Sequence, residues 1–386
     1  MHIIIDNILR ILNPTDEILK YCKEELEIDN PQFTQNKRLG FSTYNIPRKL
    51  CWYEKRGSDV IVPFGCLNKI YALYPHKEDY ELLIPAPKKI HYKSNIKLYD
   101  YQEEAKNKAL KSKNGVIVMA AGSGKTQTAL QLIAELGVKT LWLTHTMDLL
   151  NQSYARAKDN FEDIKISKIA NGKIDIAENI TFATVQTLSK VDISQYKNEF
   201  DCVIVDEGHR IAGTPAQLGM FYKVINALSA RYKFALTATP YRNVKGTEKA
   251  LFALIGDIIC EVSKEQIADR IIKAKIQPVK TKFTIPECAQ KYDGTIEYSR
   301  LTTALCEDKE RNDIILRILK KHKKNYTLVL SDRLSQLEYL QEKLGYGLKI
   351  DGSMTSKKAK QQREQAIEDM RLGKEHLLMA SYRISS

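Results

Sequence analysis

Short runs of apolar and β-branched residues alternate with segments of helical periodicity between residues 95 and 262. Each run is only a few residues long, which suits a buried strand and is too short for a helix. Gly137 directly follows the helical segment Thr126–Leu136, as a C-terminal helix cap does. Strands that alternate with helices predict a parallel sheet with helices on both faces. The predicted strands are Val116–Met119, Thr140–Thr144, Ile180–Thr184, Cys202–Val205 and Phe234–Thr237.

The same alternation begins again near Gln277 and continues to the end of the sequence. It predicts a second α/β domain, whose two predicted helices are each followed by a glycine, Gly345 and Gly373. The sequence ends soon after the last predicted strand, so we expect this second domain to be cut short. Its predicted strands are Tyr326–Leu330, Leu348–Ile350 and His376–Ala380, and its predicted helices are Asp332–Leu344 and Ser356–Leu372.

The N-terminal region differs from both α/β domains because it consists of short, aromatic-rich segments separated by prolines. The segments Phe41–Tyr44, Leu50–Glu54 and Asp59–Pro63 predict a small β-rich or α+β domain, with some helix at its start. The predicted domains are therefore residues 1–92, 93–263 and 264–386.

Charge adds a hint about the partner. The chain has 386 residues and a net charge of +13. This charge favours binding of a polyanion such as nucleic acid, although a soluble protein from a lysine-rich proteome would also be basic. Residues 31–98 hold twelve Lys and Arg against five Asp and Glu, a local net charge of +7. Their interleaved aromatic and basic residues suit phosphate contacts with base stacking, but equally suit a small core with lysines outside. Lys49, Trp52 and Arg56 are the candidate nucleic-acid contacts here.

Other features exclude some classes of protein. The seven cysteines form no C-x-x-C pair, so we expect no structural metal. No stretch approaches 18 consecutive apolar residues, and the start lacks the pattern of an export signal. We therefore expect no membrane association, and a cytoplasmic protein with reduced thiols.

The strongest chemical signal is the segment Ala120–Thr126, with the sequence AAGSGKT, between a predicted strand and a predicted helix. Small residues let backbone N–H groups surround phosphates, and the helix N-terminus adds partial positive charge. Lys125 would then contact the β- and γ-phosphates of ATP, and the Thr126 hydroxyl would coordinate Mg²⁺. Met119 stands where the usual pattern has its first glycine. The predicted phosphate-binding residues are Ala121, Gly122, Ser123, Gly124, Lys125 and Thr126.

A second signal is the acidic pair Asp206 and Glu207 at the end of an apolar strand. Parallel strands end at one edge of a sheet, so this pair is expected beside the phosphate loop. Asp206 suits coordination of Mg²⁺, and Glu207 suits orienting and deprotonating the attacking water.

Together these residues resemble the motifs of superfamily 2 DExH helicases. The loop at Ala120–Thr126, the segment Asp206–His209 and the segment Leu236–Pro240 follow that family's order and approximate spacing. The similarity covers about residues 95–386, and the N-terminal region resembles the extra domain of phage-encoded recombination or branch-migration helicases of the UvsW type and of XPB-like proteins. The resemblance implies an α/β fold of two RecA-like lobes, the second truncated, behind a small DNA-recognition domain.

The resemblance also implies roles for single residues. Tyr99 and Gln102 lie in a segment similar to the glutamine motif, which contacts the adenine of ATP. His209, Thr237 and Thr239 are implied to couple the nucleotide to nucleic acid. The implied nucleic-acid contacts, in segments similar to motifs Ia, Ic, IV and V, are Thr144, His145, Thr184, Gln186, Ser331, Arg333 and Ser381.

The function that this resemblance implies is an ATP- and Mg²⁺-dependent DNA helicase or translocase. It would act as a monomer on branched or forked DNA in replication, recombination or repair, in the bacterial host's cytoplasm if phage-encoded. An RNA helicase and a duplex translocase that separates no strands remain alternatives. The family's arginine-bearing motif VI does not occur before Ser386, so impaired turnover, or an ATP-dependent DNA clamp with little hydrolysis, is a further alternative.

Overall fold

The computed structural model of the chain forms two compact units, Met1–Lys273 and Ala274–Ser386. The boundary predicted after residue 92 falls inside the first unit, and the three-part division remains a prediction. The described residues are 1–170, 173–212, 215–241, 246–269, 275–291, 294–351 and 357–382.

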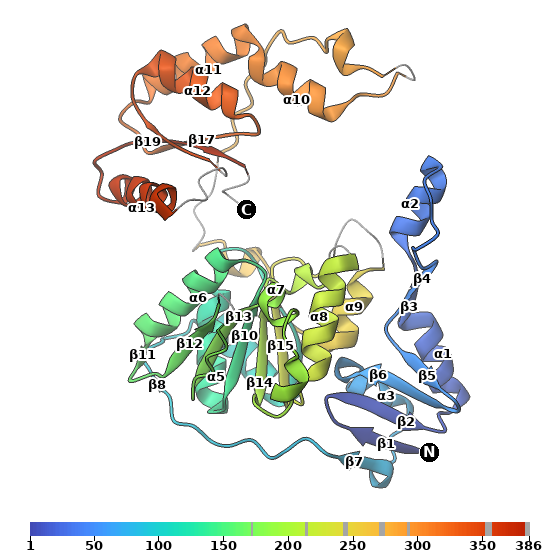
Figure 1. The fold of residues 1–386 in the computed structure, drawn as a ribbon. Coiled ribbons are helices and arrows are strands. Elements are labelled where there is room, and N and C mark those ends of the chain that lie inside the picture. Colours follow the sequence, from blue (N-terminus) through green and yellow to red (C-terminus); the bar gives the residue numbers. More distant parts are fainter. Residues whose placement is uncertain are drawn as a thin grey trace. The chain divides into compact units, whose positions relative to one another are not determined.

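A seven-stranded parallel sheet, in the order β12-β13-β10-β14-β15-β9-β16, forms the centre of the first unit (Figure 1). All five predicted strands are confirmed, with ends shifted by two residues at most. The apolar runs did not indicate the edge strands β12 and β16, which carry polar residues such as Lys168 and Glu261. The strands are β9 (Asn114–Met119), β10 (Thr140–Thr144), β12 (Ile166–Ile169), β13 (Ile180–Thr184), β14 (Cys202–Asp206), β15 (Tyr232–Thr237) and β16 (Ile258–Val262).

Helices cover both faces of this sheet because its strands are apolar on both sides. In β14, Val203 and Val205 join one buried cluster, and Ile204 joins a second cluster on the opposite face. This alternation is the two-residue period of a strand. Gly137 ends α5 in the left-handed conformation, which confirms the predicted cap. The helices are α4 (Asp100–Ser112), α5 (Lys125–Leu136), α6 (Met147–Asn160), α7 (Val185–Leu188), α8 (Pro215–Ala227) and α9 (Glu248–Ile255).

The N-terminal region forms a second sheet in the first unit, in the order β5-β6-β2-β1-β7. The β-rich prediction is confirmed, but the chain begins with the hairpin β1–β2 and not with a helix. Of the three aromatic-rich segments that predicted this domain, Phe41–Tyr44 forms no strand and lies in the irregular stretch after α2. The elements are β1 (His2–Ile5), β2 (Ile8–Leu12), α1 (Asp16–Glu25), β3 (Glu27–Asp29), α2 (Pro31–Leu39), β4 (Lys49–Cys51), β5 (Glu54–Arg56), β6 (Asp59–Pro63), α3 (Leu67–Leu73) and β7 (Tyr80–Leu82), and β8 (Lys93–Ser94) pairs with β11 (Phe161–Glu162).

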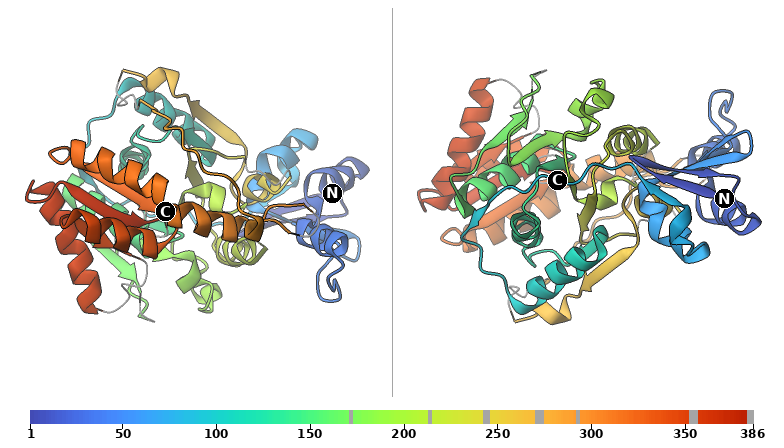
Figure 2. Two further views of the ribbon diagram at one scale, coloured as in Figure 1. Left: turned by 90° about the horizontal axis from the view of Figure 1, so that it is seen from above. Right: turned by 90° about the horizontal axis from the view of Figure 1, so that it is seen from below.

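Close packing joins the N-terminal region to α9, which packs on the parallel sheet (Figure 2). A Cβ atom added to Gly65, in a 3₁₀ turn after β6, would lie 2.5 Å from the carbonyl oxygen of Ala253 in α9. Only glycine allows this approach. Asp6 accepts hydrogen bonds from Lys197 (2.5 Å) and Ser229 (2.6 Å), so buried polar contacts reinforce the apolar ones.

A fully buried lysine lies at the same junction. Lys233 in β15 donates to the carbonyl oxygens of Ile225 (3.3 Å) and Asn7 (3.4 Å), and its ammonium lies 4.8 Å from the centre of the Phe64 ring. Burial lowers the pKa of Lys233 to about 7, and the nearby Asp6 carboxylate partly offsets this effect. Burying a charge costs free energy unless the charge is paired, so burial shifts Lys233 toward its neutral form.

The second unit contains a three-stranded parallel sheet in the order β17-β19-β18, packed between helices. The cluster around Leu340 and Met379 joins α11 and α12 to one face of the sheet, and the cluster around Ala366 joins α13 to the other. All three predicted strands are confirmed. The predicted helix that begins at residue 356 starts outside the described residues. The elements are α10 (Tyr298–Glu307), α11 (Lys309–Lys321), β17 (Thr327–Ser331), α12 (Leu334–Leu344), β18 (Leu348–Ile350), α13 (Lys357–Arg371) and β19 (Leu377–Ser381).

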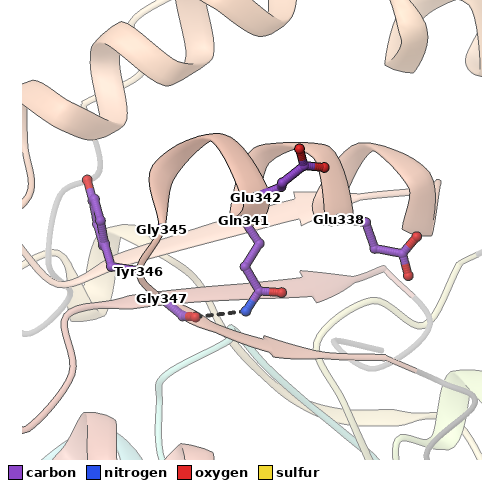
Figure 3. A pocket seen from close by; sticks show the side chains of 6 residues that line it. All are labelled: Glu338, Gln341, Glu342, Gly345, Tyr346 and Gly347. Atoms are coloured by element: carbon purple, nitrogen blue, oxygen red, sulfur yellow. Dashed lines mark hydrogen bonds between the residues drawn. The ribbon is translucent and has the colours of Figure 1, made fainter.

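A surface pocket of the second unit lies between the end of α12 and the start of β18 (Figure 3). Gln341 donates a hydrogen bond to the carbonyl oxygen of Gly347 (3.0 Å), the residue before β18. The pocket is therefore at the amino edge of the sheet, whereas ligands of open α/β sheets bind at the carboxyl edge. Glu338 and Glu342 also line it and disfavour an anion. Within the described ranges, no helix is long and apolar enough to cross a membrane.

We predict that Lys233→Met flattens the pH dependence of stability. The unfolded chain binds more protons than the folded one between pH about 7 and 10.5, so this residue makes the unfolding free energy rise with pH in that window. The decrease in slope should be up to about 1.4 kcal/mol per pH unit. Urea unfolding at pH 7, 8.5 and 9.5 measures it, with exposed Lys158→Met as control. Identical slopes for Lys233→Met and the wild type would contradict the prediction.

Candidate active site

The loop between β9 and α5 has the backbone conformation of a phosphate cradle. Gly122 and Gly124 have φ angles of +81° and +80°, where side chains with a Cβ are strained. Gly124 immediately precedes α5, so the helix N-terminus faces the loop. The hydroxyl of Ser123 is buried without a hydrogen-bond partner in the described part of the chain. A buried hydroxyl of this kind fits an anionic oxygen, so the loop fits the phosphates of ATP.

Gln102 holds the phosphate loop in place through hydrogen bonds of its side chain. Its side-chain oxygen accepts from the Tyr99 N–H (2.9 Å), and its amide group donates to the Ser123 carbonyl (2.8 Å). The Tyr101 hydroxyl donates to the same carbonyl (3.1 Å). Any side chain at Gly124 would collide with Gln102, at 2.3 Å from its amide nitrogen. Gln102 is 3% exposed and Tyr99 is 51% exposed, so the Tyr99 ring is the more accessible of the two predicted adenine contacts.

Strand β14 brings Asp206 to the carboxyl edge of the sheet, where the carboxylate is buried. Asp206 accepts hydrogen bonds from the Glu207 N–H (3.0 Å) and from the Ser153 hydroxyl (3.3 Å). Burial, with the like charge of Glu207 as a second cause, raises the pKa of Asp206 to about 6, although the nearby Lys125 opposes this shift. The Asp206 carboxylate and the Thr126 hydroxyl offer the oxygen atoms that Mg²⁺ prefers as ligands, so these two residues fit Mg²⁺.

The residues expected to couple nucleotide and nucleic acid form a connected chain. Nδ1 of His209 lies 3.2 Å from a Glu207 carboxylate oxygen and 3.2 Å from the Thr237 hydroxyl. The Thr237 oxygen in turn accepts from the Thr239 N–H (3.2 Å). The hydrogen bond from His209 is the main cause that lowers the pKa of Glu207, and the charge of Lys125 acts in the same direction. Glu207 is therefore ionised at neutral pH, as a base requires.

Two polar residues of α6 complete the site, and no sequence motif indicated them. Ser153 contacts Asp206, and one turn later the Arg156 guanidinium donates to the Thr126 hydroxyl (2.9 Å). Residues three apart on a helix share one face, so α6 contacts both predicted Mg²⁺ ligands at once. The only signal in the sequence is this spacing of polar residues, which many exposed helix faces also show.

The two predicted nucleic-acid segments of the first unit meet at the same edge. Thr144 and Thr184 are paired in the register of β10 and β13, and His145 and Gln186 are hydrogen-bonded at 2.9 Å. Both threonine hydroxyls bond within the protein, Thr144 to the Thr146 carbonyl and Thr184 to Thr187. Because both threonines are buried, His145 and Gln186 are the more accessible members of this set.

In the second unit, Ser331 and Ser381 pair at the carboxyl ends of β17 and β19. Ser331 donates to Gln336 (2.6 Å), whereas the Ser381 hydroxyl is buried without a partner among the described residues. Arg333 donates to Thr303 (3.0 Å) and to the carbonyl of Ser299 (2.8 Å), so α10 holds its guanidinium. Nucleic-acid contact by these three residues remains a prediction.

One predicted contact in the N-terminal region is wrong. Trp52 is 2% exposed and packs in the apolar core with Leu26, so its ring has no free face for a base. Lys49 forms an ion pair with Glu27, and Arg56 binds both carboxylate oxygens of Glu54 at 2.9 and 3.0 Å. These two cations face solvent but already have anionic partners.

Comparison with known proteins agrees with this geometry. Residues 95–242 match the family model described as Type III restriction enzyme, res subunit. The chain resembles the superfamily 2 helicases. A DNA 3'-5' translocase XPB2 of Sulfurisphaera tokodaii is 27% identical over 328 residues, which are 75% of this chain and 71% of that protein. A DNA 3'-5' helicase XPB of Mycobacterium tuberculosis is 24% identical over 74% of this chain and 51% of its own length.

Two viral proteins are also similar to this chain. A putative ATP-dependent RNA helicase of Acanthamoeba polyphaga mimivirus is 27% identical over 60% of this chain. That alignment spans 44% of the viral protein, so the chain matches about half the length of several helicase relatives. The crystal structure of the UvsW helicase from bacteriophage T4 is similar with a TM-score of 0.49 and 17% identity, over 67% of this chain and 100% of that one.

We predict that Asp206→Asn stabilises the protein at neutral pH. The folded protein binds more protons than the unfolded one between pH about 3.8 and 6, so this residue lowers stability as the pH rises through that window. In Mg²⁺-free buffer at pH 7.5 the unfolding free energy should rise by about 1–3 kcal/mol, and the gain should vanish below pH 4. Urea unfolding measures this, with exposed Asp159→Asn as control. Destabilisation by Asp206→Asn at pH 7.5 would contradict the prediction, because it would mean that hydrogen bonds and Lys125 fully offset the cost of burying the ionised carboxylate.

We also predict that Arg156→Ala weakens binding of ATP in the absence of Mg²⁺ by about fivefold. The substitution removes a cation, which now holds the Thr126 hydroxyl, from the phosphate end of the site. Titration of a fluorescent ATP analogue with and without Mg²⁺ measures the change. Lys158→Ala, which removes an exposed cation from the same helix, is the matched control. Equal affinities of Arg156→Ala and the control would exclude this role for Arg156.

Proposed function

We propose that this chain is an ATP-dependent DNA helicase or translocase that acts on branched or forked DNA in replication, recombination or repair. The observation that carries the proposal is the hydrogen-bonded chain from Glu207 through His209 to Thr237, beside the loop that ends in Lys125. It connects the acid expected at the γ-phosphate to the edge that holds the predicted nucleic-acid segments.

The residues divide the chemistry among them. Backbone N–H groups of the loop and the Lys125 ammonium hold the phosphates, and the ionised Glu207 orients the attacking water and accepts its proton. Mg²⁺, when bound, neutralises the charge of the β- and γ-phosphates, and Thr126 and Asp206 would hold it. When Glu207 accepts the proton on hydrolysis, its contact with His209 changes. His209 passes this change through Thr237 to the sheet edge that holds the predicted nucleic-acid segments.

Several features support DNA over RNA as the substrate. The relatives from Sulfurisphaera and Mycobacterium carry DNA in their names, and the sequence DEGH at 206–209 differs from the DEAD form of dedicated RNA helicases. An RNA substrate is the second candidate, because the mimivirus relative is a putative RNA helicase. Function as a monomer and location in the cytoplasm belong to the proposal as well.

We predict that Glu207→Gln retains ATP binding but lowers nucleic-acid-stimulated hydrolysis by about 100-fold or more, because the amide cannot accept a proton. Lys125→Ala should weaken ATP binding itself. Hydrolysis is measured without nucleic acid and with single-stranded DNA, forked DNA, linear duplex DNA and RNA of equal sequence, and unwinding is measured on the forked and the linear DNA. Exposed Glu104→Gln is the control.

The outcomes separate the candidates. Stronger stimulation and unwinding by forked DNA than by linear duplex supports the proposal, and stronger stimulation by RNA favours the second candidate. Normal hydrolysis by Glu207→Gln overturns the assignment of the base. Absence of stimulation by every nucleic acid overturns the proposed function.

A further inference from the structure

A protruding segment of the N-terminal region makes little contact with the rest of its domain, so packing does not explain which side chains it exposes. This segment, residues 30–48, is called the arm below and contains α2 and the turn after it. Helix α2 has no buried residue, so it contributes nothing to the core of its domain. Figure 1 shows α2 standing away from the five-stranded sheet of the N-terminal region.

The arm is nevertheless well ordered by hydrogen bonds at its base. Asn30 is 1% exposed, and its backbone N–H donates to the Arg48 carbonyl (2.9 Å) while its side chain donates to the Pro47 carbonyl (2.8 Å). The Asn30 side-chain oxygen also caps α2 by accepting from the Gln32 N–H (3.0 Å). The ladder β3–β4 continues this closure below the arm. The arm therefore presents its tip in a defined geometry.

Large apolar and aromatic side chains at the tip of the arm are exposed to solvent. Tyr44 is 93% exposed, Phe41 is 63% exposed and Leu39 is 55% exposed. The turn is held from within, since the Phe41 N–H donates to the Asn36 carbonyl (2.9 Å) and the Asn36 side chain donates to the Ser42 carbonyl (3.2 Å). Exposed apolar residues that lie this close together mark a binding site more often than an ordinary surface.

The charge of the arm indicates which partner suits it. Residues 30–53 contain Lys37, Arg38, Arg48 and Lys49 but no Asp or Glu. Lys49 is paired with Glu27, whereas Lys37, Arg38 and Arg48 make no ion pair within the described part of the chain. Three exposed cations and two exposed aromatic rings on the same arm are complementary to a strand that offers phosphates and unstacked bases.

We propose that the arm is a binding site for single-stranded nucleic acid, with Phe41 and Tyr44 stacking on bases and Lys37, Arg38 and Arg48 contacting phosphates. The proposal rests on the proposed function, because a nucleic-acid motor supplies the strand. It moves the N-terminal contact from Trp52, which is buried, to side chains that reach solvent. Bases of an intact duplex are stacked on one another, so the aromatic rings favour an unpaired strand over a duplex.

The test compares the full chain with its Phe41→Ala/Tyr44→Ala variant in fluorescence-anisotropy titrations. The probes are a single-stranded DNA, an RNA of the same sequence and a blunt DNA duplex. Removal of two stacking side chains should weaken binding of the single strands by at least about tenfold and leave duplex binding nearly unchanged. A larger effect on one of the two single strands identifies which nucleic acid the arm takes.

The basic residues are tested by salt dependence. Lys37→Ala/Arg38→Ala/Arg48→Ala should reduce the slope of log affinity against log salt by about 0.7 for each phosphate that the variant no longer neutralises, or about 2 in total. Lys20→Ala/Lys23→Ala, which removes two exposed cations from α1 in the same region, and Tyr298→Ala, which removes a tyrosine that is 79% exposed in the second unit, are the matched controls. Unchanged unfolding midpoints establish that the variants are folded.

Two negative outcomes are distinguishable. If the wild type binds single strands and the arm variants bind them equally well, the arm proposal is overturned while the proposed function stands, and a protein partner becomes the occupant of the arm. If the wild type binds no nucleic acid and its ATP hydrolysis is not stimulated, the proposed function is overturned and the arm proposal with it.

Discussion

The parallel pairing of seven strands is the constraint on which the candidate site depends. Parallel strands end at one edge, so β9, β14 and β15 deliver the phosphate loop, Asp206 and Thr237 to neighbouring positions although they are far apart in sequence. β10 and β13 extend the same edge with Thr144 and Thr184. No residue of the site needs an unusual local conformation to reach its partners, apart from the glycines of the loop and Glu207 at φ +53°.

Burial of charge gives this edge its chemical character. Asp206 is held as a buried carboxylate next to the carboxylate of Glu207, and this raises its pKa. Lys125 from the loop compensates part of the cost, as does the hydroxyl of Ser153 from α6. A bound cation would offset the remaining free-energy cost of the buried carboxylate. A buried carboxylate of this kind lowers the free energy of unfolding of the protein without ligand and raises the affinity of the site for a cation.

The N-terminal region has two different surfaces. The inner one meets α9 and β15 through Gly65, Asp6 and Lys233, where backbones approach closely and polar groups are buried. The outer one is the arm, whose aromatic tip and exposed cations have no task in the core. The inner contact places the arm in the same compact unit as the candidate active site.

The sequence by itself determined five of the seven strands of the parallel sheet, because a continuous apolar run of only a few residues is typical of a strand buried on both faces. It also indicated the phosphate loop, because the glycines and Lys125 must be adjacent in the chain. Asp206, Glu207 and the chain from His209 to Thr237 followed from motif order. Only the tertiary structure revealed Arg156 and Ser153, since a polar residue on α6 carries no mark of what lies across from it. It also showed that Trp52 is buried, whereas Phe41 and Tyr44 are exposed. An aromatic residue gains free energy both from a core and from a stacked base, so only its solvent exposure distinguishes the two uses.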